Sequence, residues 1–232
     1  MIETRSLAKA FGPKPVLRGV DLDIAPGEFV ALMGPNGAGK TTLMRILATL
    51  SRPSLGRASV AGFPLPAAAE HVRRRLGVVL HHPLLYGDLS AEENLRFYAR
   101  MYGLKNPEAR MTQVLEQVGL AARRREPVRT FSRGMQQRLA IARAVLHDPE
   151  VMLFDEPYTG LDQAASDMLD GVLREAAARG RTVLMTTHDL LRGLALADRV
   201  LVLARGVIAF SAWRGDVDPA QFARLYESAV NQ

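Results

Sequence analysis

A glycine-rich run near residue 40 has the residue types and the spacing of a phosphate-binding loop. The run follows a short apolar stretch and reads, in order, Gly34, Pro35, Asn36, Gly37, Ala38, Gly39, Lys40, Thr41 and Thr42. Its three glycines let successive backbone N–H groups point inward around phosphate oxygens, and the dipole of a following helix favours an anion there. In such a run the lysine reaches the β- and γ-phosphates, and the hydroxyl of Thr41 ligates Mg²⁺. The sequence therefore predicts a site for a nucleotide with Mg²⁺ at this run, which we call the phosphate loop (residues 34–42).

Two acidic residues follow an apolar, strand-like run at residues 151–154. In open α/β sheets, ligands bind outside the carboxyl ends of the strands, which is where Asp155 and Glu156 would lie. We predict that Asp155 holds Mg²⁺ through water and that Glu156 polarises the attacking water. An apolar strand that ends in acids is common, so this assignment depends on its pairing with the phosphate loop.

The elements expected to position these residues alternate between strands and helices. Continuous apolar runs predict strands at residues 28–33, 76–80, 151–154, 182–187 and 199–203, with a hairpin turn at Arg205 and Gly206 into 207–210. Helical spacing predicts helices at residues 40–50, 90–103, 107–118, 139–146 and 164–178, the second with a capping box of Ser90 and Glu93. Buried strands alternating with helices indicate a mostly parallel sheet. The helical stretch at roughly residues 88–146, which we call the helical lobe, reads as an insertion in one α/β domain over residues 1–232.

A second run, residues 131–138, suggests how the nucleotide is used. It reads Phe131, Ser132, Arg133, Gly134, Met135, Gln136, Gln137 and Arg138. This signature run resembles the signature motif of ATP-binding-cassette (ABC) ATPases, and the resemblance covers essentially the whole chain, with six motifs in order. It implies a P-loop NTPase fold of the ABC type, with a mostly parallel core sheet, an antiparallel β subdomain and the helical lobe. It also implies a head-to-tail dimer with two ATP molecules, each contacted in trans by residues 132–135, above all by the Ser132 hydroxyl and the Gly134 backbone.

Four further residues match that family by position. His188 resembles the switch histidine that contacts the γ-phosphate, although a lone histidine at a strand end is more often a surface residue. Asp162 lies in the stretch resembling the loop that carries dimer contacts, and by itself would pass as a helix cap. Phe11 lies where the family stacks an aromatic ring on adenine, with Val16 beside the adenine or ribose, whereas a core aromatic is the competing interpretation.

The chain departs from the family at two places. His81 and His82 stand where the family usually has a glutamine that contacts Mg²⁺ and water, and either imidazole could take that role. A metal site is disfavoured because adjacent residues on a strand face opposite ways. Phe131, Arg133 and Met135 stand where Leu, Gly and Gln are commonest; Arg133 adds a cation beside the partner's γ-phosphate, which we predict strengthens ATP-driven closure.

Composition limits the partners. The net charge is +6, with arginine clusters at residues 73–75 and 123–125, but no aromatic-interleaved basic run or DNA-binding spacing accompanies them, so we expect solvated faces and no nucleic acid. The chain has no cysteine, no apolar run near the roughly 18 residues of a membrane span and no leader-like start. We therefore expect a peripheral location on the cytoplasmic side of a membrane.

Two functions compete on this resemblance. The first is the ATP-hydrolysing energy-coupling subunit of a membrane exporter, in which integral membrane subunits dock near residues 81–86 and the helical lobe. The second is a soluble ABC ATPase acting on ribosomes or DNA, which the absence of a second cassette and of a long coiled coil disfavours. Local runs at residues 89–98 and 155–162 are similar to haem-exporter ATP-binding subunits of cytochrome c maturation.

Overall fold

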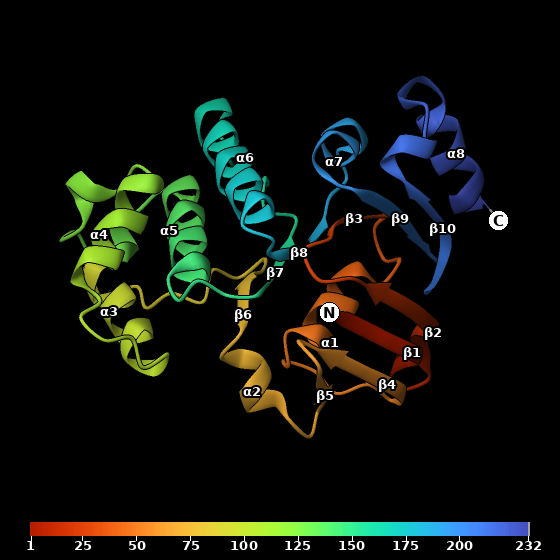
Figure 1. The fold of residues 1–232 in the computed structure, drawn as a ribbon, viewed down its shortest axis with the longest axis horizontal. Coiled ribbons are helices and arrows are strands. Elements are labelled where there is room, and N and C mark those ends of the chain that lie inside the picture. The colour runs from red at the N-terminus through yellow and green to blue at the C-terminus, as the bar shows by residue number, and fades with distance from the viewer. Residues whose placement is uncertain (232) are drawn as a thin grey trace.

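The computed structural model describes residues 1–231, and its centre is a six-stranded sheet (Figure 1). The strand order is β10-β9-β3-β8-β7-β6, with every pair parallel except β9 and β10. The strands are β3 (Phe29–Met33), β6 (Leu76–Val79), β7 (Val151–Asp155), β8 (Thr182–Thr186), β9 (Arg199–Ala204) and β10 (Val207–Trp213). Every residue of β3, β7 and β8 is buried, as expected for a parallel sheet covered on both faces. The mostly parallel core predicted from the apolar runs is confirmed.

A second sheet forms the antiparallel subdomain that the family resemblance implied. Its order is β2-β1-β4-β5, with β1 paired to both β2 and β4. The strands are β1 (Ile2–Phe11), β2 (Lys14–Ile24), β4 (Leu55–Val60) and β5 (Phe63–Leu65). The buried residues of this sheet pack against those of α1 (Lys40–Leu47), so the subdomain supports the helix that follows the phosphate loop.

The helices divide between the core and the helical lobe. Around the core are α1, α2 (Ala69–Arg73), α6 (Gln163–Ala178), α7 (Leu190–Leu196) and α8 (Pro219–Asn231). The lobe contains α3 (Ala91–Met101), α4 (Glu108–Gln117) and α5 (Arg133–Val145), which lie together beyond the sheet edge at β6 (Figure 1). Short 3-10 turns lie at Ala121–Arg123, Val128–Thr130 and Arg214–Asp216. Within residues 1–231, no helix has both the length and the apolar character to cross a membrane.

Several boundaries differ from the sequence-based expectation. The helix predicted over residues 40–50 ends at Leu47, because the chain turns at Thr49, whose φ is 64°. The strand predicted to residue 80 ends at Val79. The predicted capping box is present, since the Ser90 hydroxyl accepts from the Glu93 backbone and the Glu93 carboxylate accepts from the Ser90 backbone. The helices α2, α7 and α8 were not expected from the sequence patterns.

Candidate nucleotide site

The phosphate loop joins β3 to α1 in a backbone path that requires glycine at two positions. Gly34 has φ 150°, and a Cβ there would lie 2.1 Å from the carbonyl oxygen of Leu203. Gly39 has φ 111°, and its Cβ would lie 2.7 Å from the Leu17 side chain. Both positions combine a left-handed backbone with a close neighbour, so the loop is held tightly against β9 and β2.

Lys40 lies within this loop rather than on its outside. The residue is 7% exposed, and Nζ donates to the carbonyl oxygens of Gly34 at 2.7 Å and Pro35 at 3.3 Å. A cavity of about 290 Å³ opens beside it and is lined by Lys14, Val16, Pro35, Asn36, Gly37, Gly39, Lys40, Thr41, Thr42 and Glu156. A buried ammonium at the base of a glycine-rich loop fits a polyphosphate, so the residues present are suited to ATP.

The two predicted acids lie at the carboxyl end of β7 and are tied to β8. Asp155 is 3% exposed, and its Oδ1 accepts from the Thr186 hydroxyl at 2.7 Å. The Glu156 backbone N–H donates to the same Thr186 hydroxyl at 2.9 Å. Glu156 has φ 51°, a left-handed conformation that is uncommon for a side chain other than glycine and that turns its carboxylate toward the phosphate loop. Its Oε1 lies 4.0 Å from Lys40 Nζ.

His188 is also brought to this carboxylate. Its Nδ1 lies 2.7 Å from Glu156 Oε2, while 74% of the side chain is exposed. The structure thus places Lys40, Glu156 and His188 in one group, from three segments that are far apart in the chain. His188 is on the surface, but its contact is with the predicted catalytic carboxylate.

A second cavity, of about 310 Å³, adjoins the first on the other side of Glu156. Its lining includes His81, Arg133, Asp155, Glu156 and Thr159. His82 is absent from the described residues that line it, although the two imidazole rings lie edge to face with centroids 5.4 Å apart. Among residues 1–231, no group of three or more metal-binding side chains is present. These positions favour His81 over His82 as the residue facing the acids.

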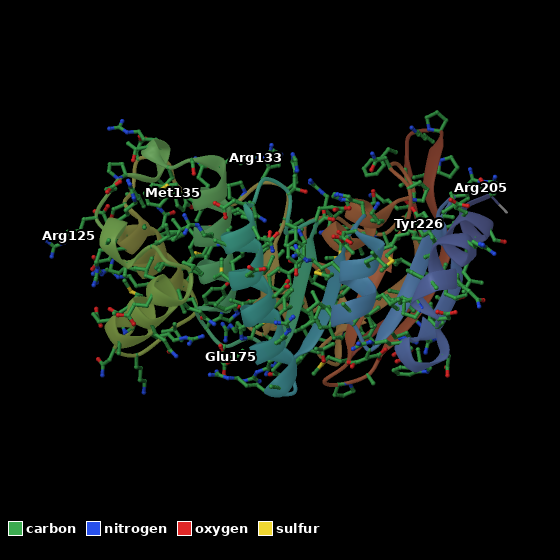
Figure 2. All side chains as sticks on the ribbon, turned by 90° about the horizontal axis from the view of Figure 1, so that it is seen from above. Arg125, Arg133, Met135, Glu175, Arg205 and Tyr226 are labelled. Carbon is green, nitrogen blue, oxygen red and sulfur yellow. The ribbon has the colours of Figure 1, made fainter. Side chains whose placement is uncertain are left out.

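The signature run begins α5 on a capped turn. The Ser132 hydroxyl accepts from the Met135 backbone N–H at 3.2 Å, and Ser132 itself is exposed. The Arg133 side chain lies along the backbone of Gly160, where a Cβ would meet its Cδ and Nε at 3.4 Å. Figure 2 shows Arg133 and Met135 on the side of the helical lobe, away from Tyr226 of α8. None of the described residues lining the phosphate-loop cavity belongs to 132–135.

The remaining predicted residues are placed less centrally. Phe11 is 56% exposed at the end of β1 with the Lys9 ammonium 5.0 Å from its ring centroid, so the core interpretation of Phe11 is wrong. Val16 lines the phosphate-loop cavity, but Phe11 is not among its lining residues. Asp162 caps α6, with its Oδ1 accepting from the Ala165 N–H at 2.8 Å, which is the simpler of the two interpretations of that residue.

The family model described as ABC transporter matches residues 17–159, more than half of the chain. The chain belongs to the ABC transporter family. The matched region contains the phosphate loop, the signature run and Glu156, while His188 lies beyond it. This ABC protein is the ATP-binding subunit of a transporter and an ATPase, as its motifs predicted.

Two relatives show the similarity along most of the ABC domain. A protein named Nod factor export ATP-binding protein I from Burkholderia orbicola (strain AU 1054) is 39% identical over 207 residues, covering 88% of this chain and 68% of the relative. An uncharacterized ABC transporter ATP-binding protein from Bacillus subtilis (strain 168) is 37% identical over 209 residues, covering 90% of this chain and 68% of that protein. The finer resemblance to haem-exporter subunits finds no support in these relatives.

Solved structures agree on the fold. One described as the ATP-binding subunit of an ABC transporter has a TM-score of 0.88 and 30% identity, and covers 100% of this chain and 95% of its own. Another is a dimeric ATP-binding cassette in a post-hydrolysis state bound to ADP and Pi, with a TM-score of 0.85, 26% identity, and coverage of 92% and 99%. The ABC ATPase fold predicted from the motifs is therefore confirmed.

Sequence reasoning missed two residues that shape the site. Thr186 of β8 pairs in register with Asp155 of β7, and its hydroxyl bonds to the Asp155 carboxylate and to the Glu156 backbone. The available signal was a hydroxyl residue at the end of the neighbouring strand. Lys14 lines the phosphate-loop cavity from the start of β2. The available signal was its basic side chain two residues before Val16.

Proposed function

We propose that this chain is the ATP-hydrolysing energy-coupling subunit of a membrane exporter, acting as a head-to-tail dimer that encloses two ATP molecules. The observation that carries the proposal is the grouping of Lys40, Glu156 and His188 at the phosphate-loop cavity. That group supplies a cation to bind phosphate, a carboxylate to orient water and an imidazole that contacts the carboxylate.

Each residue has a role that follows from its atoms. Lys40 would release the carbonyls of Gly34 and Pro35 to hold the β- and γ-phosphates, with the loop N–H groups around them. Thr41 and Asp155 would hold Mg²⁺, which when bound neutralises phosphate charge. Glu156 would orient the water for in-line attack at the γ-phosphorus, and His188 would fix that carboxylate and reach the γ-phosphate.

The position of the signature run supports the proposed dimer. Ser132 and Gly134 belong to no described lining of the phosphate-loop cavity, and Ser132 is exposed at the N-terminus of α5. A helix N-terminus with an exposed cap hydroxyl suits a phosphate, and a second copy, or a homologous ATPase subunit, would bring one there. Two solved cassettes that resemble this chain are described as dimeric, which supports the same arrangement.

Replacing Glu156 by Gln tests the assignment of the reaction. The amide keeps the shape of the side chain but no longer polarises water, so we expect kcat to fall by about a thousandfold while ATP still binds. The ATP-bound dimer should then persist in size-exclusion chromatography with light scattering. A Glu156→Gln protein that hydrolyses ATP at the original rate would remove Glu156 from this role.

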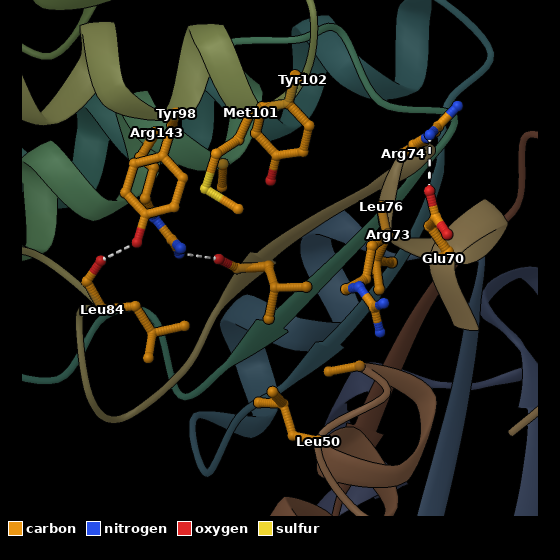
Figure 3. Close-up of a pocket in the computed structure, with 13 residues that line it drawn as sticks. Leu50, Glu70, Arg73, Arg74, Leu76, Leu84, Tyr98, Met101, Tyr102 and Arg143 are labelled. Carbon is orange, nitrogen blue, oxygen red and sulfur yellow. Dashed lines mark hydrogen bonds and ion pairs between the residues drawn. The ribbon is translucent and has the colours of Figure 1, made fainter.

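A groove between the core and the helical lobe is suited to a membrane partner. It encloses about 400 Å³ between the ends of α1 and α2, strand β6, and helices α3 and α5 (Figure 3). We call it the docking groove; its lining comprises Ala48, Leu50, Glu70, Arg73, Arg74, Leu76, Val78, Leu84, Tyr98, Met101, Tyr102, Arg143 and Ala144. Leu50, Leu84 and Met101 are 48%, 42% and 67% exposed there. Exposed apolar side chains gathered around a hollow mark a protein interface.

The docking groove also holds a buried cation that has no acidic partner among the described residues. Arg143 is 5% exposed, and its guanidinium donates to the Val78 carbonyl and lies 5.2 Å from the Tyr98 ring (Figure 3). Its Nε is buried without an acceptor among residues 1–231. By contrast, Arg74 is paired with Glu70 at 2.7 Å. We infer that the partner segment in this groove is amphipathic and carries a carboxylate toward Arg143.

The names of the relatives favour export as the direction of transport. Several are called Nod factor export ATP-binding proteins, and the same direction is proposed for this chain. Docking on integral membrane subunits would place the chain at the cytoplasmic face of the membrane as a peripheral protein. The competing function is a soluble ATPase acting on ribosomes or DNA, and the names of these relatives do not support it.

Co-purification from detergent-solubilised membranes separates the two functions. The wild-type chain should recover a polytopic membrane protein, and Leu84→Glu should lower that recovery by more than tenfold because a charge replaces an apolar contact. Leu225→Glu is the matched control, since Leu225 is 39% exposed on α8, outside the described groove lining. Recovery of ribosomes or DNA instead, unaffected by Leu84→Glu, would favour the soluble ATPase. Circular dichroism of each variant checks that the fold is retained.

A further inference from the structure

The loop between β7 and α6 is held by a tyrosine that the nucleotide site itself does not use. This loop, residues 157–161, begins directly after Glu156 and ends at the helix cap Asp162. Tyr158 is partly buried, and its hydroxyl donates to Asp170 Oδ1 in α6 at 2.5 Å. The loop is thereby fixed to a point on α6 two turns beyond the cap.

The same tyrosine contacts the helix that follows His188. The Arg192 guanidinium lies 4.5 Å from the centroid of the Tyr158 ring, and its Nε lies 3.9 Å from Asp170 Oδ1. Arg192 belongs to α7, and its backbone N–H donates to the Asp189 side chain, which caps α7 one residue after His188. Tyr158, Asp170 and Arg192 therefore join three segments: the loop, α6 and the helix adjoining His188.

The surroundings of the Tyr158 phenol favour its role as a hydrogen-bond donor. The Asp170 side chain is 13% exposed, so its charge is largely shielded from water and is compensated by Arg192. Burial, together with the bond to Asp170, raises the pKa of the Tyr158 phenol, which stays a donor at physiological pH. A hydrogen bond from a phenol to a carboxylate is stronger than one between neutral groups.

On its other side the loop is held by the signature helix. Gln137 of α5 donates from Nε2 to the Pro157 carbonyl at 3.0 Å. Arg133 of α5 lies along Gly160, which has φ 81°. The loop 157–161 is thus a mechanical link between α5, where a partner's phosphate would be bound, and the His188 segment, where this chain's own Glu156 is oriented.

We propose that Tyr158, Asp170 and Arg192 act as a positioning cluster that transmits the position of the signature helix to His188 and Glu156. The inference rests on the proposed function, because it needs a dimer in which α5 contacts a second nucleotide. None of the three residues touches the phosphate-loop cavity among the residues described, so ATP binding by one chain does not depend on them. Their effect falls on the hydrolysis step and on the communication between the two sites.

The test is Tyr158→Phe, which removes the hydroxyl and keeps the ring under Arg192. We expect kcat to fall about tenfold and the Hill coefficient for ATP to approach one, because the lost bond has a charged acceptor. The Kd of a single chain for ATP should stay within about twofold. Asp170→Asn should have the same effect, and the double variant should be no worse than the more severe single variant, since the two groups form one bond.

Tyr226→Phe is the matched control, because Tyr226 is another partly buried tyrosine of the same hydrophobic core, on α8. It should retain the wild-type kcat and Hill coefficient. If Tyr158→Phe retains both, or if the two single effects add, the cluster is only structural and the inference is overturned. If Tyr158→Phe does not fold, Arg192→Lys, which keeps the charge and loses the planar contact, decides in its place. If the wild-type chain does not hydrolyse ATP, the proposed function is wrong. If the wild type is active and Tyr158→Phe has the same kcat and Hill coefficient, only this inference is wrong.

Discussion

The nucleotide site and the docking groove lie on the same core but are built in opposite ways. At the nucleotide site the described polar groups bond to one another: Asp155 to Thr186, Glu156 to His188, and Lys40 to its own loop. In the docking groove, Arg143 is buried without an acidic partner in the part of the chain that the structure describes. Apolar side chains remain open to solvent around it.

The difference indicates which kind of ligand each region binds. A small ligand such as ATP can displace the Lys40 bonds to carbonyls, so the nucleotide site can be formed before the ligand arrives. The docking groove has exposed apolar area to be covered and a guanidinium to be neutralised. A protein segment can do both, because it carries apolar side chains and a carboxylate together. Ligand binding at the nucleotide site should therefore depend on backbone geometry, whereas binding in the docking groove should depend on the polarity and charge of its side chains.

The largest expected effect comes from altering the backbone of the phosphate loop. Gly34→Ala would place a Cβ 2.1 Å from the Leu203 carbonyl oxygen at φ 150°, a conformation that side chains rarely adopt. We expect the free energy of unfolding to fall by about 3 kcal/mol or more, and ATP binding to be lost, because either the loop or β9 must move. Urea denaturation and nucleotide titration measure the two effects.

Gly171→Ala is the control for the same chemical change. Gly171 lies in α6 without a positive φ, and a Cβ there meets nothing within 4 Å. We expect it to stabilise the chain by about 0.5–1 kcal/mol, as alanine does in a helix interior. Equal effects of the two substitutions would show that the phosphate loop is not under the geometric constraint described.

The same contrast explains how much could be predicted from the sequence. The phosphate loop and the acids of β7 were predicted because each depends on residue type and short spacing. His188 was predicted only from its position in the family resemblance. The docking groove was predicted only as a region near residues 81–86 and the helical lobe, since Leu50, Tyr98 and Arg143 meet through tertiary packing. Thr186 was missed for the same reason, because its partner Asp155 is on another strand.

A smaller effect is expected at the wall of the docking groove, where His147 lies behind Tyr102. The two rings are stacked with centroids 3.6 Å apart. Burial is the main cause that lowers the pKa of His147 to about 4; the charges of Arg143 and Arg110 act in the same direction, and that of Asp148 opposes them. The unfolded chain therefore binds a proton near pH 6.5 that the folded chain does not accept until about pH 4.

The sign of the pH effect follows from that difference. The free energy of unfolding should be unaffected by His147 above pH 6.5 and should fall by up to about 3 kcal/mol as pH drops from 6.5 to 4. His147→Phe keeps an aromatic ring on Tyr102 and should abolish this part of the pH dependence in urea denaturation. His71→Phe is the control, because His71 is exposed and stacked on Phe63. If His147→Phe and wild type lose stability in parallel below pH 6.5, the wall of the groove is not the titrating region.

The smallest expected effect concerns Arg133, the first residue of α5. Its side chain is exposed, lies along Gly160 and lines the cavity that contains Asp155 and Glu156. Within a dimer the guanidinium would lie beside a phosphate of the partner's ATP, but an exposed cation is screened by salt and gains little. We therefore expect Arg133→Gly, measured in the Glu156→Gln background, to raise the ATP concentration needed for dimerisation by only about threefold at low salt and less at high salt. Arg133→Lys should restore most of the loss if charge is the cause. An unchanged ATP dependence would mean that Arg133 acts through Gly160 alone, and its effect would then fall on the loop rather than on the partner's nucleotide.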